Sequence, residues 1–245
     1  MDAPPSTPPS SVEDFYARVE TAIPELDARL NVFLAEYRAF RAARGNTPLR
    51  VLDIGCGRLA LLAHAIEPAD EYWGADIVER DQMGIENFVS INLNEQRLSD
   101  HVPEGTQFDV VFCGEVVEHL FSPDALLVDL KTLLAPGGLL VLSTPNLAYW
   151  PNRILLPLGI SPLFLENSAW QKLGRRFKGL GQGNKTEGHI RVFTYRALRE
   201  LLDLHGYALQ KVVALPVWDT PVDKVICKCA PSLSPDIVYI SHLRS

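Results

Sequence analysis

Two glycines and two aspartates near the start of the chain have the types and spacing of a ligand-binding turn. The mostly apolar run Val51-Leu52-Asp53-Ile54 is typical of a buried β-strand, and Gly55-Cys56-Gly57 follows it directly. Glycine has no Cβ, so a loop that contains two glycines can adopt positive φ and approach a ligand closely. The spacing predicts a strand, a tight turn and a helix over 58–66, which together bind a ligand at the carboxyl edge of a parallel sheet.

The glycine pattern alone allows two kinds of ligand. Gly55-x-Gly57-x-x-Ala60, with Asp76 about twenty residues further on, also satisfies the dinucleotide fingerprint. Asp53, however, stands two residues before the first glycine, where a dinucleotide-binding strand is usually apolar. A carboxylate there would repel a pyrophosphate but would suit the ammonium group of a methionine moiety.

A second segment, 108–120, ends a further apolar strand in Cys113-Gly114-Glu115 and continues into Glu118-His119. On these two motifs, the chain from the glycine turn to about residue 230 resembles a class I S-adenosylmethionine-dependent methyltransferase. Leu59 departs from the pattern, because the family has a third glycine at that position. The resemblance implies S-adenosylmethionine as the methyl donor and S-adenosylhomocysteine as the product.

Strands and helices alternate along the chain, which predicts an α/β fold with helices on both faces of a sheet. We expect a doubly wound, Rossmann-like, seven-stranded and mostly parallel sheet, and the resemblance implies an antiparallel last strand beside the fifth. The expected strands are 49–54, 71–75, 87–91, 108–113, 139–143, 209–215 and 224–229. Ser122 and Thr194 are expected to cap two of the helices.

The chain divides into four expected parts. Residues 1–10 form a proline-rich disordered leader, 11–45 form N-terminal helices, 46–230 form the methyltransferase domain, and 231–245 form a C-terminal extension. Residues 147–187 are expected to be a substrate lid inserted in the domain. The N-terminal helices either cover the substrate mouth or simply pack against the sheet.

The resemblance also assigns cofactor-binding residues. Asp76 ends the second strand, where its carboxylate can accept both hydroxyl protons of a ribose, and Ile77 offers an apolar wall to adenine. Asn92 stands where the family usually has an acid that contacts the adenine amino group, and its amide oxygen can still accept that hydrogen bond. The full set expected to contact the cofactor is Asp53, Gly55, Cys56, Gly57, Asp76, Ile77, Asn92, Leu93, Cys113, Gly114 and Glu115.

Methyl transfer needs few side chains, because the sulfonium is already an excellent leaving group and the protein mainly aligns the reactants. A protonated acceptor needs a nearby base. His119 and His189 are the catalytic candidates, although each could equally be a structural histidine. The residues expected to contact substrate are Glu118, Asn146, Tyr149, Trp150 and Arg191.

The lid combines a proline-broken apolar part with a basic part. Six Lys or Arg and one acid, Glu187, lie between Lys172 and Arg191 in a chain of net charge −7. This reversal of charge suggests an anionic group on the acceptor; the alternatives are a solvated loop and, for the apolar part, contact with a membrane surface.

Composition limits the remaining options. The acidic balance argues against a general nucleic-acid binder, and no apolar run reaches the roughly 18 residues of a membrane span. Cys56, Cys113, Cys227 and Cys229 lack metal-site spacing, so we expect free thiols, no metal and a reducing cytoplasm. The assembly state stays open, with a homodimer as one option.

The sequence therefore predicts a methyltransferase acting on an oxygen, with nitrogen second, of a small molecule such as a secondary metabolite or a sugar. Two alternatives remain. The chain could be a catalytically silent cofactor-binding partner subunit, which Leu59 and Asn92 would favour, or a dinucleotide-dependent oxidoreductase, which Asp53 disfavours.

Overall fold

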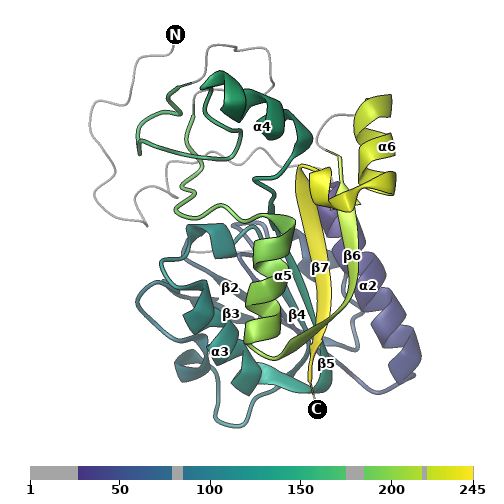
Figure 1. The fold of residues 1–245 in the computed structure, drawn as a ribbon. Coiled ribbons are helices and arrows are strands. Elements are labelled where there is room, and N and C mark those ends of the chain that lie inside the picture. Colours follow the sequence, from purple (N-terminus) through teal and green to yellow (C-terminus); the bar gives the residue numbers. More distant parts are fainter. Residues whose placement is uncertain (1–26, 79–84, 175–184, 217–219, 245) are drawn as a thin grey trace.

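A computed structural model of the 245-residue chain describes residues 27–78, 85–174, 185–216 and 220–244. Seven strands form one sheet in the order β3-β2-β1-β4-β5-β7-β6 (Figure 1). Neighbours from β3 through β5 pair in parallel, and β7 pairs antiparallel with both β5 and β6. The expected fold, including an antiparallel strand beside the fifth, is confirmed. The strands are β1 (Arg50–Ile54), β2 (Glu71–Asp76), β3 (Asn87–Ser90), β4 (Phe108–Gly114), β5 (Leu134–Pro145), β6 (Tyr207–Leu215) and β7 (Asp236–Leu243).

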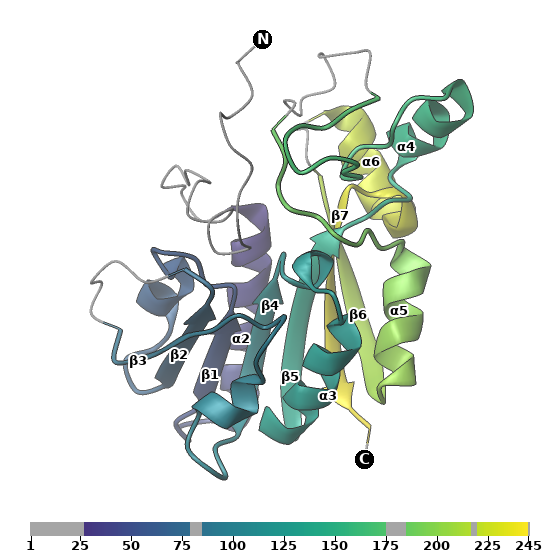
Figure 2. The ribbon, with the colours of Figure 1, turned by 90° about the vertical axis from the view of Figure 1, so that its left-hand side faces the viewer.

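Helices cover both faces of the sheet (Figure 2). Helix α2 (Ala28–Arg44) packs Phe33, Leu34 and Tyr37 on one face, next to the short 3-10 helix η1 (Leu61–Ala65). Helices α3 (Pro123–Leu133) and α5 (Tyr195–Leu204) pack on the other face. Because both faces are buried, the central strands are almost uniformly apolar, as parallel strands usually are.

Local signals set the helix ends where the sequence predicts them. The side chains of Ser122 and Thr194 accept hydrogen bonds from Ala125 N and Ala197 N, so both expected caps are confirmed. Gly45 follows α2 with φ of 66°, a left-handed conformation that glycine adopts without strain. The expected first N-terminal helix and the leader lie outside the described residues.

Two predicted elements are wrong. Residues 224–229 belong to helix α6 (Pro221–Cys229), which Thr220 caps through Asp223 N. The Thr-Pro pair is a helix-start signal that outweighs the β-branched residues following it. The antiparallel strand is instead β7, inside the supposed C-terminal extension, where Ile237, Val238 and Ile240 are buried.

The helix expected over 58–66 also differs. Residues 57–60 form a turn, Ala60 adopts φ of 39°, and only the 3-10 helix η1 follows.

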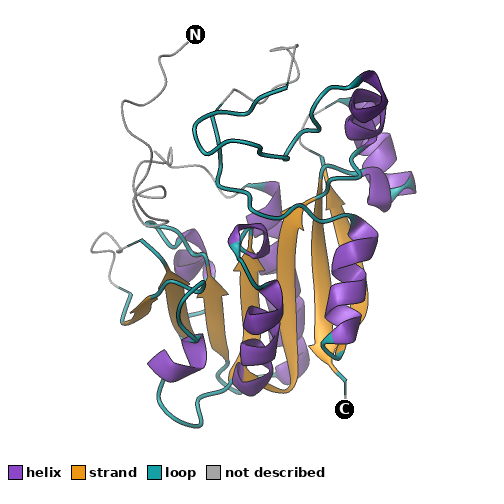
Figure 3. Ribbon diagram, turned by 60° about the vertical axis from the view of Figure 1, so that its left-hand side comes forward, coloured by secondary structure: helices purple, strands orange, loops and turns teal. Residues whose placement is uncertain are grey.

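The described residues of the expected lid, 147–174 and 185–187, lie with α6 beyond the carboxyl ends of the parallel strands (Figure 3). They contain α4 (Trp150–Leu155) and a small core of their own, made of Tyr149, Leu155, Ile160, Leu163 and Phe164. Within the described residues, no helix combines the length and apolarity that crossing a bilayer requires. The cytoplasmic location stays a prediction.

Candidate functional site

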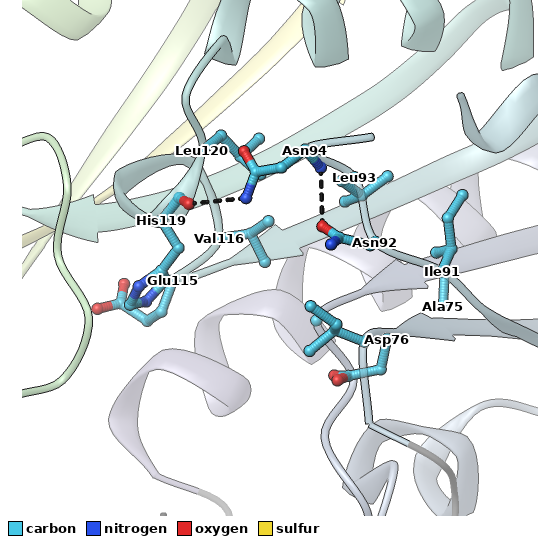
Figure 4. Close-up of a pocket in the computed structure, with 12 residues that line it drawn as sticks. Ala75, Asp76, Ile91, Asn92, Leu93, Asn94, Glu115, Val116, His119 and Leu120 are labelled. Carbon is cyan, nitrogen blue, oxygen red and sulfur yellow. Dashed lines mark hydrogen bonds between the residues drawn. The ribbon is translucent and has the colours of Figure 1, made fainter. Parts of the chain in front are cut away.

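A cavity of about 190 Å³ opens at the carboxyl ends of β1, β2 and β4 (Figure 4). Asp76 lies on one side of it, and Glu115 and His119 lie on the other. Strand ends from far apart in the sequence therefore form one pocket, as expected for a doubly wound sheet. Its lining residues are Gly55, Ala75, Asp76, Ile77, Ile91, Asn92, Leu93, Asn94, Glu115, Val116, His119 and Leu120.

The glycine turn comes unusually close to the wall of this cavity. Gly55 has φ of +73°, and a Cβ built on it would lie 2.3 Å from Val116 Cγ2. Gly57 has φ of +68°, but a Cβ there would meet nothing within 4 Å. Both positions need a left-handed conformation, and Gly55 also needs the missing side chain.

Asp76 joins the turn to the end of β2. Its Oδ2 accepts a hydrogen bond from Gly57 N at 2.7 Å, and its Oδ1 accepts one from Val78 N at 3.0 Å. A carboxylate has about four lone-pair positions, so two remain for a ligand. Burial raises the pKa of Asp76, and its backbone hydrogen bonds act in the opposite direction. The remaining positions match the two hydroxyls of a ribose.

Asn94 is a lining residue that sequence reasoning missed. Its Nδ2 donates to the carbonyl oxygen of His119 at 3.3 Å, and its Oδ1 accepts from Phe121 N at 2.7 Å. Asn92 Oδ1 in turn accepts from Asn94 N at 3.1 Å (Figure 4). These bonds connect the loop after β3 to the loop after β4. The repeat Asn92-Leu93-Asn94 directly after a strand was the available signal.

Five of the expected cofactor contacts, Asp53, Cys56, Gly57, Cys113 and Gly114, lie beside the cavity without lining it. Asp53 is buried and accepts a hydrogen bond from Tyr72 Oη at 2.7 Å. Burial raises the pKa of Asp53 to about 7.

The first turn of helix α2 reaches the end of the pocket where Glu115 lies. A Cβ on Gly114 would lie 3.2 Å from Phe33 Cε2, and Arg29 Nη1 lies 3.8 Å from Glu115 Oε1. Of the two roles expected for the N-terminal helices, α2 therefore packs on the sheet and also brings its first turn to the rim of the site.

His119 and His189 lie together, with ring centroids 5.1 Å apart. His119 Nδ1 is 3.0 Å from the carbonyl oxygen of Gly188, and His189 Nδ1 is 2.9 Å from that of Phe164. A carbonyl only accepts, so each neutral ring carries its proton on Nδ1 and its lone pair on Nε2. Burial lowers the pKa of His119 to about 4, so that ring is neutral at pH 7.

Segment 188–191 is fastened to the 3-10 helix η3 (Val117–His119) by backbone bonds. Ile190 N and Arg191 N both donate to the carbonyl oxygen of Glu118, each at 2.9 Å. The guanidinium of Arg191 donates to the carbonyl oxygens of Leu120 and Phe121. Arg191, expected to contact substrate, thus holds this segment in place.

The side chain of Glu118 is 1% exposed, and Thr144 Oγ1 donates to its Oε2 at 3.0 Å. Burial, together with the nearby charge of Glu115, raises the pKa of Glu118 well above its ordinary value. Glu118 is adjacent to a lining residue but does not itself line the cavity.

The other residues expected to contact substrate, Asn146, Tyr149 and Trp150, make hydrogen bonds within the protein. Asn146 donates to the carbonyl oxygens of Ser232 and Ser234 and is 1% exposed. Tyr149 Oη and Trp150 Nε1 both donate to the buried carboxylate of Asp223, at 3.1 and 2.9 Å. These bonds connect α4 to α6 away from the cavity lining.

The basic part of the lid is only partly described. Lys172 Nζ is buried and lies 3.6 Å from Glu166 Oε1 and 3.0 Å from Glu187 Oε1. Its charge is therefore compensated within the protein. Arg175, Arg176 and Lys178 lie outside the described residues, so the anionic acceptor stays a prediction.

Comparison with known proteins adds three findings. A family profile described as a methyltransferase domain matches residues 26–212. A ubiquinone biosynthesis O-methyltransferase of Roseobacter denitrificans is 39% identical over 107 residues, which cover 40% of this chain and 42% of that protein. One from Psychrobacter arcticus is 37% identical over 119 residues, covering 43% and 44%. The matched segment thus spans under half the length of these curated relatives.

Solved structures agree on the fold. A SAM-dependent methyltransferase from Archaeoglobus fulgidus has a TM-score of 0.52 at 20% identity, covering 86% of this chain and 93% of that one. The magnesium protoporphyrin IX methyltransferase from Synechocystis, with bound SAH, has a TM-score of 0.54 at 16% identity, covering 97% and 96%. At this level of identity the similarity is one of fold.

Proposed function

Because the chain belongs to the class I S-adenosylmethionine-dependent methyltransferase family, we propose that it transfers a methyl group from this donor to an oxygen of a small molecule. The observation that carries the proposal is one cavity with the Asp76 carboxylate at one end and the neutral imidazole of His119 at the other. The first group suits a nucleoside, and the second suits an acceptor that must lose a proton.

The residues present fit the donor. Asp76 has acceptor positions left for two ribose hydroxyls, while Ile77, Ile91 and Leu93 give that end apolar walls for a base. Gly55 lets backbone approach without a side chain in the way. S-adenosylmethionine supplies a methyl group on a sulfonium leaving group, so the chain's own task is to align the acceptor and receive its proton.

Oxygen is the preferred acceptor atom and nitrogen the alternative. The curated relatives are named O-methyltransferases, and the acceptor end is lined by Val116, Leu120 and the neutral ring of His119. The apolar part of this surface suits a largely apolar small molecule, such as a secondary metabolite, and the carboxylate of Glu115 on the same side keeps an amine as the alternative acceptor.

The imidazole pair is the proposed route for the acceptor's proton. Its low pKa makes His119, which lines the cavity, a weak proton acceptor at neutral pH. His189 does not line the cavity, but its ring centroid lies 5.1 Å from that of His119, and it is the proposed second acceptor. His189→Asn is expected to lower kcat by about 10²–10⁴ and to leave S-adenosylhomocysteine affinity unchanged. His205→Asn, at a half-buried histidine that is paired with Asp124 and does not line the cavity, is the matched control.

The test combines binding and turnover. Calorimetry is expected to show S-adenosylhomocysteine binding, and methyl-labelled donor is expected to label hydroxylated members of an acceptor panel, with amines as the second group. Binding of NAD without binding of S-adenosylhomocysteine would overturn the proposal. Unchanged kcat in His189→Asn would remove that residue from the proton route but leave the transfer assignment standing.

A further inference from the structure

The side chains of Glu118, His119 and His189 come together beside the acceptor end. A proton route needs only the two imidazoles and gives the buried carboxyl of Glu118 no role. One ligand atom from each of Glu118, His119 and His189 lies within 4.8 Å of the other two. We propose that this Glu118–His119–His189 cluster binds a divalent first-row transition-metal ion, with Zn²⁺ as the reference ion. Glu118 and His119 are consecutive in the sequence, whereas His189 comes 70 residues after His119. Its approach to the other two depends on the docking of segment 188–191 on η3.

The first support is a buried carboxylate oxygen that lacks a hydrogen-bond partner. Glu118 is 1% exposed; its Oε2 accepts from Thr144, but its Oε1 is buried with no hydrogen bond. Its Oε1 faces the imidazole of His119, with Nε2 3.9 Å away. Buried polar atoms are nearly always satisfied, and a carboxylate without a partner is costly. A cation between Glu118 and the imidazoles would remove this cost.

The second support is the orientation of the two rings. Both Nδ1 atoms are held by backbone carbonyls, of Gly188 and Phe164, at 3.0 and 2.9 Å. Metal-binding histidines typically donate their second nitrogen to a carbonyl or carboxylate, which fixes the tautomer and presents the other lone pair to the ion. Both rings already have that arrangement, with Nε2 as the ligand atom.

The donor set favours the class of ion. Two imidazoles and one carboxylate suit Zn²⁺ and its first-row neighbours, whereas Mg²⁺ prefers oxygen ligands alone. Ligand atoms around a tetrahedral zinc lie about 3.3 Å apart, so the cluster would contract by roughly 1 Å on binding. Three protein ligands also leave one coordination position open, as in catalytic zinc sites.

A neighbouring cluster also contains His189, but Lys172 already neutralises the charge of its carboxylates. Glu166, Glu187 and His189 also converge within 4.8 Å. The buried Nζ of Lys172, however, pairs with both carboxylates, and Glu166 accepts backbone hydrogen bonds from Glu187 and Gly188. A second cation there would meet the charge of Lys172, so the ion belongs at Glu118.

Ion binding gives the cluster a part in the reaction, and this step rests on the proposed function. His119 lines the cavity, so the open position is next to the acceptor end. An ion there would lower the pKa of a bound hydroxyl directly. With the ion bound, the imidazoles would act as ligands in place of the proton route proposed above, and the hydroxyl proton would leave to solvent.

The experiment measures ion binding without any substrate. Metal-stripped full-length protein is titrated with Zn²⁺ by calorimetry and with Co²⁺ by visible absorption, in wild type and in Glu118→Gln, His119→Asn, His189→Asn and Glu187→Gln. Circular dichroism checks the fold of each variant. We expect one ion per chain and Co²⁺ d–d bands without the thiolate charge-transfer band that cysteine ligation would add.

The variants separate the two clusters. We expect affinity to fall in the first three variants by more than the roughly 10–100-fold that losing an outer-shell partner costs, and to persist in Glu187→Gln. Lack of stoichiometric binding by wild type, or loss in Glu187→Gln with retention in His119→Asn, would overturn the inference. His119→Asn decides this even if Glu118→Gln does not fold. S-adenosylhomocysteine binding, measured in parallel, tests the proposed function separately.

Discussion

Replacing Asp76 by alanine tests the proposed cofactor site most directly. In the free protein its two carboxylate oxygens each accept one backbone hydrogen bond, from Gly57 and from Val78. The same carboxylate is the group to which we assign both ribose hydroxyls. Asp76→Ala should therefore weaken the ligand and loosen the glycine turn, and the two effects are separable.

The expected magnitude follows from those bonds. The two bonds to a charged acceptor together contribute about 1.5–3 kcal/mol to ligand binding, which corresponds to a roughly 10–150-fold higher Kd for S-adenosylhomocysteine. Separately, loss of the hydrogen bonds from Gly57 and Val78 should lower the free energy of unfolding of the ligand-free protein by about 1–3 kcal/mol. Asp76→Asn keeps the side-chain volume and one oxygen, so its loss of affinity should be smaller.

Calorimetric titration measures the first effect, and urea unfolding of the ligand-free protein measures the second. Asp109→Ala is the matched control, because the Asp109 carboxylate also accepts a backbone N–H, from Arg50 at 3.0 Å, but at the opposite end of β4. The control should lose stability and keep its affinity. A folded Asp76→Ala protein that binds S-adenosylhomocysteine as wild type does would refute the ribose assignment.

Three further perturbations probe the support of the site. Burial raises the pKa of Asp53 to about 7, so the folded protein holds this proton more tightly than the unfolded chain does. The free energy of unfolding that this group contributes near pH 4 should therefore be lost as pH rises to 7. Unfolding titrations should show wild type losing up to about 4 kcal/mol over this range relative to Asp53→Asn. Gly55→Ala should cost more unfolding free energy than Gly57→Ala, since both pay about 1–2 kcal/mol for positive φ but only Gly55 faces Val116; equal losses would contradict the close approach. Asp223→Ala removes the hydrogen bonds that Tyr149 and Trp150 donate to α6 and should reduce amide-exchange protection over 147–165 and raise the acceptor's KM, without changing S-adenosylhomocysteine affinity.

The sequence predicts those parts of the fold whose signals are local. The strand-turn motif at 51–57 and the caps at Ser122 and Thr194 each depend on residues a few positions apart, and the structure has them where expected. The apolar strands of a parallel sheet are equally visible, because burial on both faces leaves a continuous apolar run.

The errors arise where a local signal was ambiguous. Residues 224–229 alternate enough to resemble a strand, but Thr220-Pro221 starts a helix that includes them. The antiparallel strand beside β5 is β7, and its β-branched residues Ile237 and Val238 lie in the segment for which the sequence predicts only a C-terminal extension.

The substrate side of the site could not be read from residue types. Tyr149 and Trp150 are aromatic and follow a strand end, as a substrate contact would, yet both bind the buried Asp223. Whether such a side chain faces a ligand or a neighbouring helix depends on where α6 packs, which no local pattern encodes.

The pairing of His119 with His189 is an example of a site contact between residues that lie far apart in the sequence. The carbonyl oxygen of Glu118 accepts both Ile190 N and Arg191 N, while His119 Nδ1 binds the carbonyl of Gly188. Docking of segment 188–191 on η3 and assembly of the imidazole pair are therefore one event. Glu166 accepts the backbone N–H groups of Glu187 and Gly188 and pairs with Lys172, so residues that do not line the cavity help to place His189 beside His119. Gly55 and Asp76, at the proposed cofactor end, are placed by the ends of β1 and β2 in the sheet itself, so that end does not depend on segment 188–191.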